Sequence, residues 1–142
     1  MKTVALTALV CLAALTGCAT APVPASQAKQ APQDRVYLAK QSIADAGRIS
    51  FVRDAGGFGS ACFLGVRLNK QLAARLDTSE IVTFDVAPGE VLVGAGRDPQ
   101  GSVLCGASGE WVQRETTIKP GEHKTFRVAV SATGTVDVSR VD

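Results

Sequence analysis

The chain has 142 residues, with 15 Lys and Arg against 13 Asp and Glu, and no run of like charge exceeds two residues. It therefore lacks the clustered cations with which proteins bind nucleic acid phosphates or an anionic membrane surface. The length suffices for one folded core but not for two, so we expect one domain and no nucleic acid partner.

The chain begins with the three parts of a signal peptide. Lys2 precedes an uncharged, largely apolar run from Thr3 to Leu15, and the run closes on Leu15-Thr16-Gly17-Cys18. This run is shorter than the roughly 20 apolar residues that cross a bilayer core, which disfavours an uncleaved transmembrane anchor. The closing residues resemble the lipobox of bacterial lipoproteins.

The resemblance to bacterial lipoproteins implies that residues 1–17 are removed as a signal peptide and that the thiol of Cys18 is acylated. In that family the new amino terminus usually receives a further acyl chain, and several chains hold a protein firmly at a membrane. Ala19 stands where an aspartate would resemble the inner-membrane retention signal. The resemblance therefore implies a lipid-anchored protein of the bacterial envelope, at the outer membrane and facing the periplasm.

Residues 18–34 are rich in Ala, Pro, Gln and Ser and show no hydrophobic periodicity. Such a composition predicts a flexible tether that spans roughly 20–25 Å. The folded domain is expected to occupy residues 35–142, and the tether would keep it near the membrane.

The four cysteines have different expected fates. Cys11 leaves with the signal peptide and Cys18 carries lipid, so Cys62 and Cys105 remain in a compartment where thiols oxidise. We expect these two to form a disulfide, which would stabilise the fold by about 4 kcal/mol in the chain-entropy model. The alternatives are two buried free thiols or two cysteines too far apart to bond. Without a Cys-x-x-Cys motif, and with His123 as the only histidine, no metal or cofactor is predicted.

Apolar and polar residues alternate through much of residues 35–142, which is the period of a strand with one buried face. In residues 62–68 the even positions are Cys, Leu, Val and Leu, so Cys62 is expected to point into the core. Residues 69–76 contain good helix formers, so that segment could be helix or strand. The expected strands are residues 36–40, 49–53, 62–68, 71–76, 80–86, 91–95, 111–118, 125–130 and 136–139.

Short breaker segments separate these strands, at the spacing of an antiparallel fold. Pro88-Gly89 and Pro120-Gly121 suit the central positions of type II turns, and we expect both to close hairpins. Residues 80–96 and 111–130 share a strand, turn and strand pattern that suggests a pseudo-repeat. Because a single sheet would leave one apolar face wet, we expect an all-β fold, a small antiparallel two-sheet β-sandwich of about seven to nine strands.

Several of these segments together resemble a known type of protein. This chain is similar to small bacterial lipoproteins with a PEGA-like β-sandwich of unknown function. The similarity lies in the lipobox, the Pro-rich tether, an opening strand at Val36-Tyr37-Leu38, a hairpin from Leu68 to Leu76, Val86-Ala87-Pro88-Gly89-Glu90 and Lys119-Pro120-Gly121-Glu122. That family commonly has Asp-Gly at its first hairpin, where this chain has Asn69-Lys70. The resemblance transfers no catalytic residue.

Candidate catalytic and binding residues are few. Gly106-Ala107-Ser108-Gly109 is one residue short of the Gly-x-Ser-x-Gly nucleophile motif, and His123 follows a predicted turn. The acidic residues are scattered singly, unlike those of a cation-binding loop. Phe58, between glycines, and Trp111 are candidates for contact with a partner, with a place in the core as the alternative for Trp111.

We therefore expect a non-enzymatic envelope module that binds another protein, through a sheet edge or the Phe58 loop. The alternative is a binder of a small molecule or glycan, and a hydrolase is the third possibility. A deep apolar pocket lined by Trp111 would favour the binder. His123 within hydrogen-bond reach of a serine and an acid would favour the hydrolase.

Overall fold

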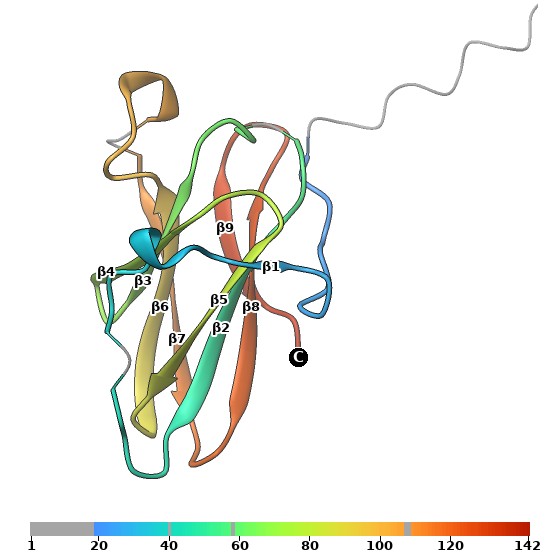
Figure 1. The fold of residues 1–142 in the computed structure, drawn as a ribbon. Helices are drawn as coiled ribbons and strands as arrows, with labels where there is room; N and C mark the ends of the chain where they lie inside the picture. Colours follow the sequence, from blue (N-terminus) through green and yellow to red (C-terminus); the bar gives the residue numbers. More distant parts are fainter. Residues whose placement is uncertain (1–18, 40, 58, 107–108) are drawn as a thin grey trace, which may run out of the picture.

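The computed structural model describes residues 19–39, 41–57, 59–106 and 109–142. They form two β-sheets packed face to face, with two single-turn 3-10 helices (Figure 1). The five-stranded sheet has the order β1 (Lys29–Gln30), β5 (Glu80–Val86), β2 (Gly47–Arg53), β8 (His123–Val130) and β9 (Val136–Arg140). The four-stranded sheet has the order β4 (Gln71–Leu76), β3 (Leu64–Leu68), β6 (Gly89–Arg97) and β7 (Trp111–Ile118). The helices are η1 (Gln33–Arg35) and η2 (Val103–Cys105).

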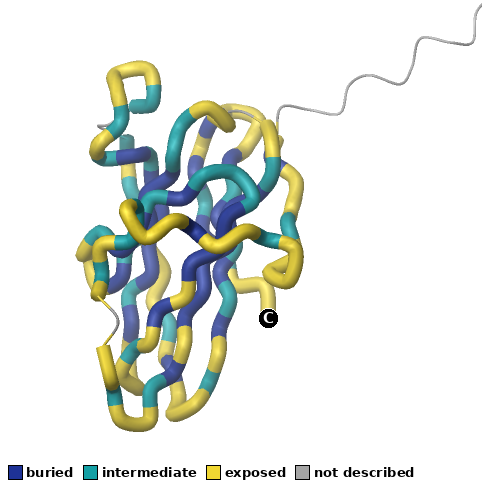
Figure 2. The backbone as a smooth tube through the Cα atoms, viewed as in Figure 1, coloured by how far each residue is buried: buried dark blue, intermediate teal, exposed yellow. Residues whose placement is uncertain are grey.

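The core lies between the sheets, where the alternation of the strands puts their apolar side chains (Figure 2). The ring of Phe51 has its centroid 6.5 Å from that of Phe84 and 6.1 Å from that of Phe126. Val66, Val93 and Leu76 come from the four-stranded sheet and are fully buried. The predicted all-β two-sheet sandwich is confirmed.

Most neighbouring strands are antiparallel, but β1 pairs with β5 and β2 pairs with β8 in parallel. Parallel neighbours need a crossover connection. Between β2 and β8 the chain passes through the whole four-stranded sheet and through β5, so the crossover is made by strands of the sandwich itself.

The two Pro-Gly turns do not close hairpins. Pro88-Gly89 joins β5 to β6 and Pro120-Gly121 joins β7 to β8, and in both cases the two strands belong to different sheets. Gly121 has φ 69°, as the second central position of a type II turn requires. Turn residues fix only local backbone angles, whereas the apolar faces on either side decide which strands pair. The hairpin prediction is therefore wrong at both turns.

The hairpin between β3 and β4 is made by Asn69 and Lys70, with φ of 48° and 70°. Positive φ at both central positions defines a type I′ turn, the geometry that Asp-Gly also favours. Residues 71–76 are a strand, which decides between the helix and strand alternatives.

The predicted strand at residues 36–40 is absent from the part that the structure describes, and Lys40 lies outside the described residues. Val36 forms a single bridge with Ala74, and the Tyr37 N–H donates to the carbonyl of Ala73 at 2.8 Å. We call residues 36–39 and 41–46 the strap. The strap crosses one side of the sandwich instead of joining a sheet.

The amino-terminal segment differs from the expected flexible tether. Thr20 donates from its backbone N–H to the carbonyl of Val130 at 3.2 Å, and Ala21 bridges to Ala55. Further on, β1 pairs with β5 and Ala31 is buried. Residues 19–34 therefore lie against the sandwich, because their backbone groups find partners at its edges. A polar, proline-rich composition did not reveal these distant partners.

Candidate functional site

The outer edge of β5 is only partly covered. The backbone N–H groups of Lys29 and Ala31 donate to the carbonyls of Ser79 and Ile81, both at 2.9 Å. Because successive residues of a strand point their backbone groups to opposite sides, those of Thr83 and Asp85 also face this edge, away from β2. Within the described part of the chain, no strand pairs with β5 on this side beyond Ile81. The second half of β5 therefore presents open backbone donors and acceptors.

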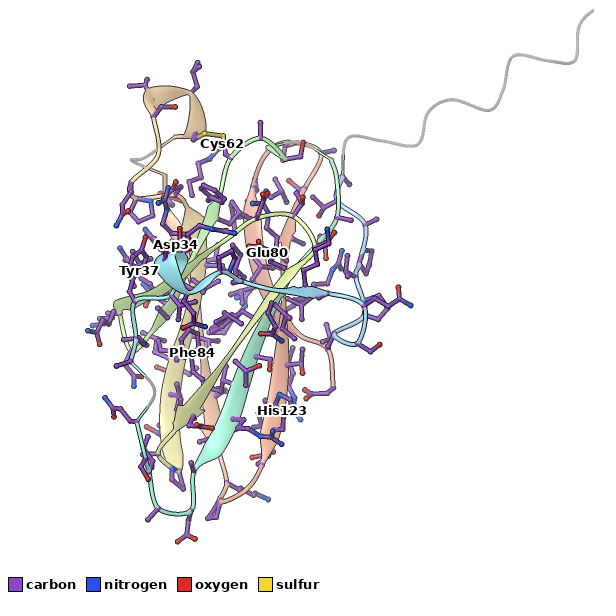
Figure 3. All side chains as sticks on the ribbon, viewed as in Figure 1. Asp34, Tyr37, Cys62, Glu80, Phe84 and His123 are labelled. Carbon is purple, nitrogen blue, oxygen red and sulfur yellow. A yellow bond between two sulfur atoms is a disulfide. The ribbon has the colours of Figure 1, made fainter. Side chains whose placement is uncertain are left out.

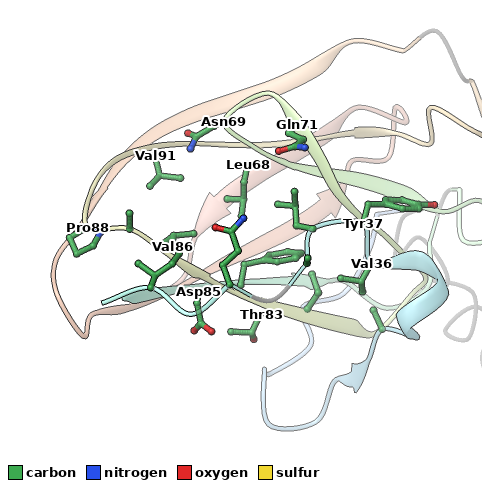
Figure 4. Close-up of a pocket in the computed structure, with 18 of the residues that line it drawn as sticks. Val36, Tyr37, Leu68, Asn69, Gln71, Thr83, Asp85, Val86, Pro88 and Val91 are labelled. Carbon is green, nitrogen blue, oxygen red and sulfur yellow. The ribbon is translucent and has the colours of Figure 1, made fainter. Parts of the chain in front are cut away.

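An open groove with a volume of about 780 Å³ runs along this edge (Figure 4). Residues 82–86 form one wall, and the strap forms another through Tyr37 and Leu38. Leu68 and Val91 contribute apolar side chains from the four-stranded sheet. The groove thus places the open backbone groups of β5 beside apolar surface.

Ion pairs fix the end of the groove beside η1. The Arg35 guanidinium donates to both carboxylate oxygens of Glu80 at 2.8 and 2.6 Å, and to the carbonyl of Arg75 at 3.0 Å. The hydrogen bond to Glu80 raises the pKa of Arg35 despite partial burial. Arg75 in turn pairs with Asp98, and the Phe63 ring lies 4.6 and 4.9 Å from the guanidinium carbons of Arg35 and Arg75. This network holds the chain where it crosses from β1 to the strap, so the groove has one fixed end.

The remaining edges of the sandwich are occupied more fully. The strap covers part of the β4 edge through Ala73 and Ala74. On the opposite side β7 lies against β9, where Arg114 donates to the carbonyl of Val138 at 3.3 Å and pairs with Asp137 at 3.1 Å. The free half of β5 is therefore the edge best placed to receive another strand.

Trp111 lies on the outer face of the four-stranded sheet, away from the groove. A Cβ atom at Gly65 would come 2.6 Å from its Cη2 atom, and one at Gly96 would come 2.7 Å from its Cδ2 atom. The Arg67 guanidinium carbon lies 3.6 Å from the ring centroid. The indole is thus half-buried between two strand glycines and an arginine. The sequence signal for this arrangement is the presence of glycines within strands of a chain that has a tryptophan on another strand. A glycine has no side chain, so an aromatic ring from a neighbouring strand can lie on the sheet there.

His123 lies on the outer face of the five-stranded sheet, next to a serine (Figure 3). Its Nε2 atom is 2.8 Å from Ser50 Oγ, which is also 2.7 Å from Thr83 Oγ1. Ser50 has no exposed surface, and in the described residues no hydrogen bond or ion pair joins His123 to a carboxylate. A buried serine without an oriented base does not make a nucleophile. Thr83, Ser50 and His123 are therefore best described as a row of hydrogen-bonded side chains that links β5, β2 and β8.

The structure pairs Cys62 with Cys105, whose Cα atoms are 5.5 Å apart. Cys62 is half-buried and lies in the loop before β3, which begins at Leu64. The prediction that it continues the core face of a strand is therefore wrong, although the predicted bond is present. Cys18 and Phe58, and Ala107 and Ser108 of the incomplete nucleophile motif, lie outside the described residues.

Residues 19–142, apart from the four positions left out, contain no group of three or more His, Cys, Asp or Glu side chains that could hold a metal ion. The same part of the chain has no helix with the length and apolar character to span a bilayer. No family model, curated protein or solved structure matches the chain.

Proposed function

We propose that this protein is a lipid-anchored, non-enzymatic module of the bacterial envelope that binds an extended segment of another envelope protein at the edge of β5. The observation that carries the proposal is the open half of β5 beside the groove. A peptide strand placed there would continue the position of β1 and bond to the backbone groups of Thr83 and Asp85. This is recognition by strand addition, in which the main chain supplies affinity and side-chain pockets supply specificity.

The shape of the groove favours an extended chain over a compact ligand. One wall is a strand edge, and adding a strand requires about 4.8 Å between neighbouring backbones. Leu68 and Val91 lie where alternate side chains of an added strand could be buried. Trp111, the residue expected to mark a pocket for a small molecule or glycan, does not line the groove.

The lipobox supports the envelope address. Cleavage before Cys18 would leave the acylated residue directly next to Ala19, and Ala19 lies against Gly57 of the sandwich. The outer membrane, facing the periplasm, is the location that Ala19 favours in proteins of this type. An anchored domain held this closely would meet partners in the thin layer next to the membrane.

The proposal is tested by photo-crosslinking in intact cells. A photoreactive phenylalanine replaces Thr83, which is exposed at the open edge, and in a matched chain it replaces Glu115, which is exposed on the other sheet. We expect Thr83 to give a discrete crosslinked protein that Glu115 does not give. The same products from both positions would contradict binding at this edge.

A second substitution separates backbone binding from side-chain contact. Asp85→Pro removes an outward N–H and leaves the bonds between β5 and β2 in place, whereas Asp85→Ala removes only the side chain. We expect the crosslink from Thr83 to be lost with Asp85→Pro and kept with Asp85→Ala. Retention of peptidoglycan fragments with no crosslinked protein would instead support the glycan-binding alternative.

A further inference from the structure

Val103 and Leu104 are almost completely exposed apolar residues. Their exposed fractions are 95% and 93%. The other exposed large hydrophobic residues among those described are Val141 at 55% and Tyr37 at 40%. Both belong to η2, in the loop that joins β6 to β7 and projects from one end of the sandwich (Figure 1). Adjacent exposed apolar residues at a projecting tip are typical of a contact surface rather than of chance exposure.

The tip is fastened to the body. Cys105, the last residue of η2, is bonded to Cys62 in the loop between β2 and β3. That loop is held in turn by Arg53, which donates to the carbonyls of Cys62 at 2.6 Å and of Gly59 at 3.1 Å. Arg53 is only 1% exposed. The two apolar side chains are therefore displayed on a supported loop.

The amino-terminal segment reaches the same end of the molecule. A Cβ atom at Gly57 would come 2.9 Å from the carbonyl carbon of Ala19, so Ala19 contacts the loop that also carries Cys62. Thr20 is tied there, because its hydroxyl donates to Asp54 at 2.6 Å. Ala19, the residue that follows Cys18 in the sequence, therefore lies at the loop that carries Cys62.

We propose that Val103 and Leu104 insert into the lipid bilayer next to the acyl chains of Cys18. The inference rests on the lipid anchor of the proposed function. With the anchor one residue from Ala19, the membrane is the apolar surface that is brought to this end of the sandwich. Uncharged residues Gly101, Ser102 and Gly106 flank the pair in the sequence. Of the charged side chains packed behind them, Asp98 is paired with Arg75, and Arg97, which lies against Gly106, is a cation that suits an anionic headgroup layer. Insertion would add a second point of attachment. It would also direct away from the membrane the turn between β5 and β6, which lies at the opposite end of the sandwich (Figure 1) and contributes Ala87, Pro88 and Gly89 to the groove.

Tryptophan fluorescence tests the insertion, because the chain has a single tryptophan. The acylated full-length protein is placed in vesicles of phosphatidylethanolamine and phosphatidylglycerol whose acyl chains carry bromine, a short-range quencher. Leu104→Trp adds a reporter at the tip. Lys119→Trp adds an exposed reporter near the turn that joins β7 to β8, far from the tip. Trp111 of the unsubstituted chain supplies the baseline.

We expect a blue-shifted emission from Leu104→Trp that the brominated lipid quenches, and no added quenching for Lys119→Trp. Equal quenching of the two variants would overturn the insertion. Mass spectrometry of the same samples separates the two proposals. An acylated Cys18 without quenching at the tip overturns the insertion alone, whereas an unmodified Cys18 overturns the anchor and the insertion with it.

Discussion

The two regions that matter most for the proposals are held in different ways. At the end near Ala19, buried polar groups connect distant segments: Asp54, with no exposed surface, accepts from Thr20 at 2.6 Å and from Arg127 at 2.7 and 2.6 Å. At the open half of β5, backbone groups on one side have no strand to pair with among the described residues. The chain thus fixes the end that would be oriented at a membrane and leaves open the edge that would receive a partner.

Among single substitutions, one at Asp54 should weaken the end near Ala19 the most. Asp54→Ala removes a fully buried carboxylate from Thr20 and from the Arg127 guanidinium, whose side chain is 31% exposed, and the loss of these hydrogen bonds to a charged group should cost about 2–3 kcal/mol. Urea unfolding measures the loss. Asp137→Ala is the control, because the Arg114–Asp137 pair is about half exposed on both sides and such pairs contribute about 1 kcal/mol or less. Equal losses in the two variants would show that Asp54 does not organise this end.

The disulfide gives an effect of similar size. Replacing Cys62 and Cys105 together by serine should lower the free energy of unfolding by about 2–4 kcal/mol, because the unfolded chain regains the freedom of an open loop. Crosslinking from Thr83 should remain, since no residue of η2 lines the groove. Two free thiols in the native protein, found by alkylation and peptide mapping, would contradict the bond itself.

Proline substitutions in β5 sharpen the contrast between its two sides. Asp85→Pro should change the free energy of unfolding by about 1 kcal/mol or less, because the lost N–H points away from β2. Val86→Pro removes an N–H that faces Gly47 and leaves its carbonyl partner unpaired, which should cost about 2–3 kcal/mol. Val86→Ala corrects for the lost side chain. A large loss for Asp85→Pro would mean that this N–H already has a partner.

The smallest predicted effect concerns Glu122, at the Pro120-Gly121 turn. The Lys119 N–H donates to its carboxylate at 2.8 Å, and this hydrogen bond lowers the pKa of Glu122. A carboxylate whose pKa is lower in the folded state stabilises the fold above its unfolded pKa, and this contribution is lost as the pH falls through the folded pKa. An NMR titration should find Glu122 below the ordinary glutamate pKa. The shift should become smaller with Lys119→Pro, which removes the donor and the Lys119 charge, while Lys124 still lowers the pKa of Glu122.

The strands were the most predictable part of the molecule. The alternation of Val82, Phe84 and Val86 with Thr83 and Asp85 is a local property of the sequence, and burial on one face follows from it. The pairing of Cys62 with Cys105 could also be predicted, because only two cysteines remain in the domain. The strand prediction depends only on neighbouring residues, and the disulfide prediction depends only on the number of cysteines in the domain.

The missed features all depend on contacts between distant residues. Nothing around Thr20 indicates that Asp54 and Val130 will hold it, and nothing around Pro88 indicates that the next strand joins the other sheet. The proximity of His123 and Ser50 arises from a parallel pairing that no turn motif signals. The sequence shows that Val103 and Leu104 are apolar residues in a loop rich in Gly and Ser. It does not show that they are exposed, because their exposure depends on where the disulfide fixes that loop.

Amide hydrogen exchange at β5 tests the central claim most directly. In the purified full-length protein we predict fast exchange at Thr83 and Asp85 and slow exchange at Val82 and Phe84, whose N–H groups face β2. In envelope membranes that retain the partner, Thr83 and Asp85 should become protected. Slow exchange at Thr83 and Asp85 in the purified protein, or fast exchange at both in the membranes, would contradict binding by strand addition.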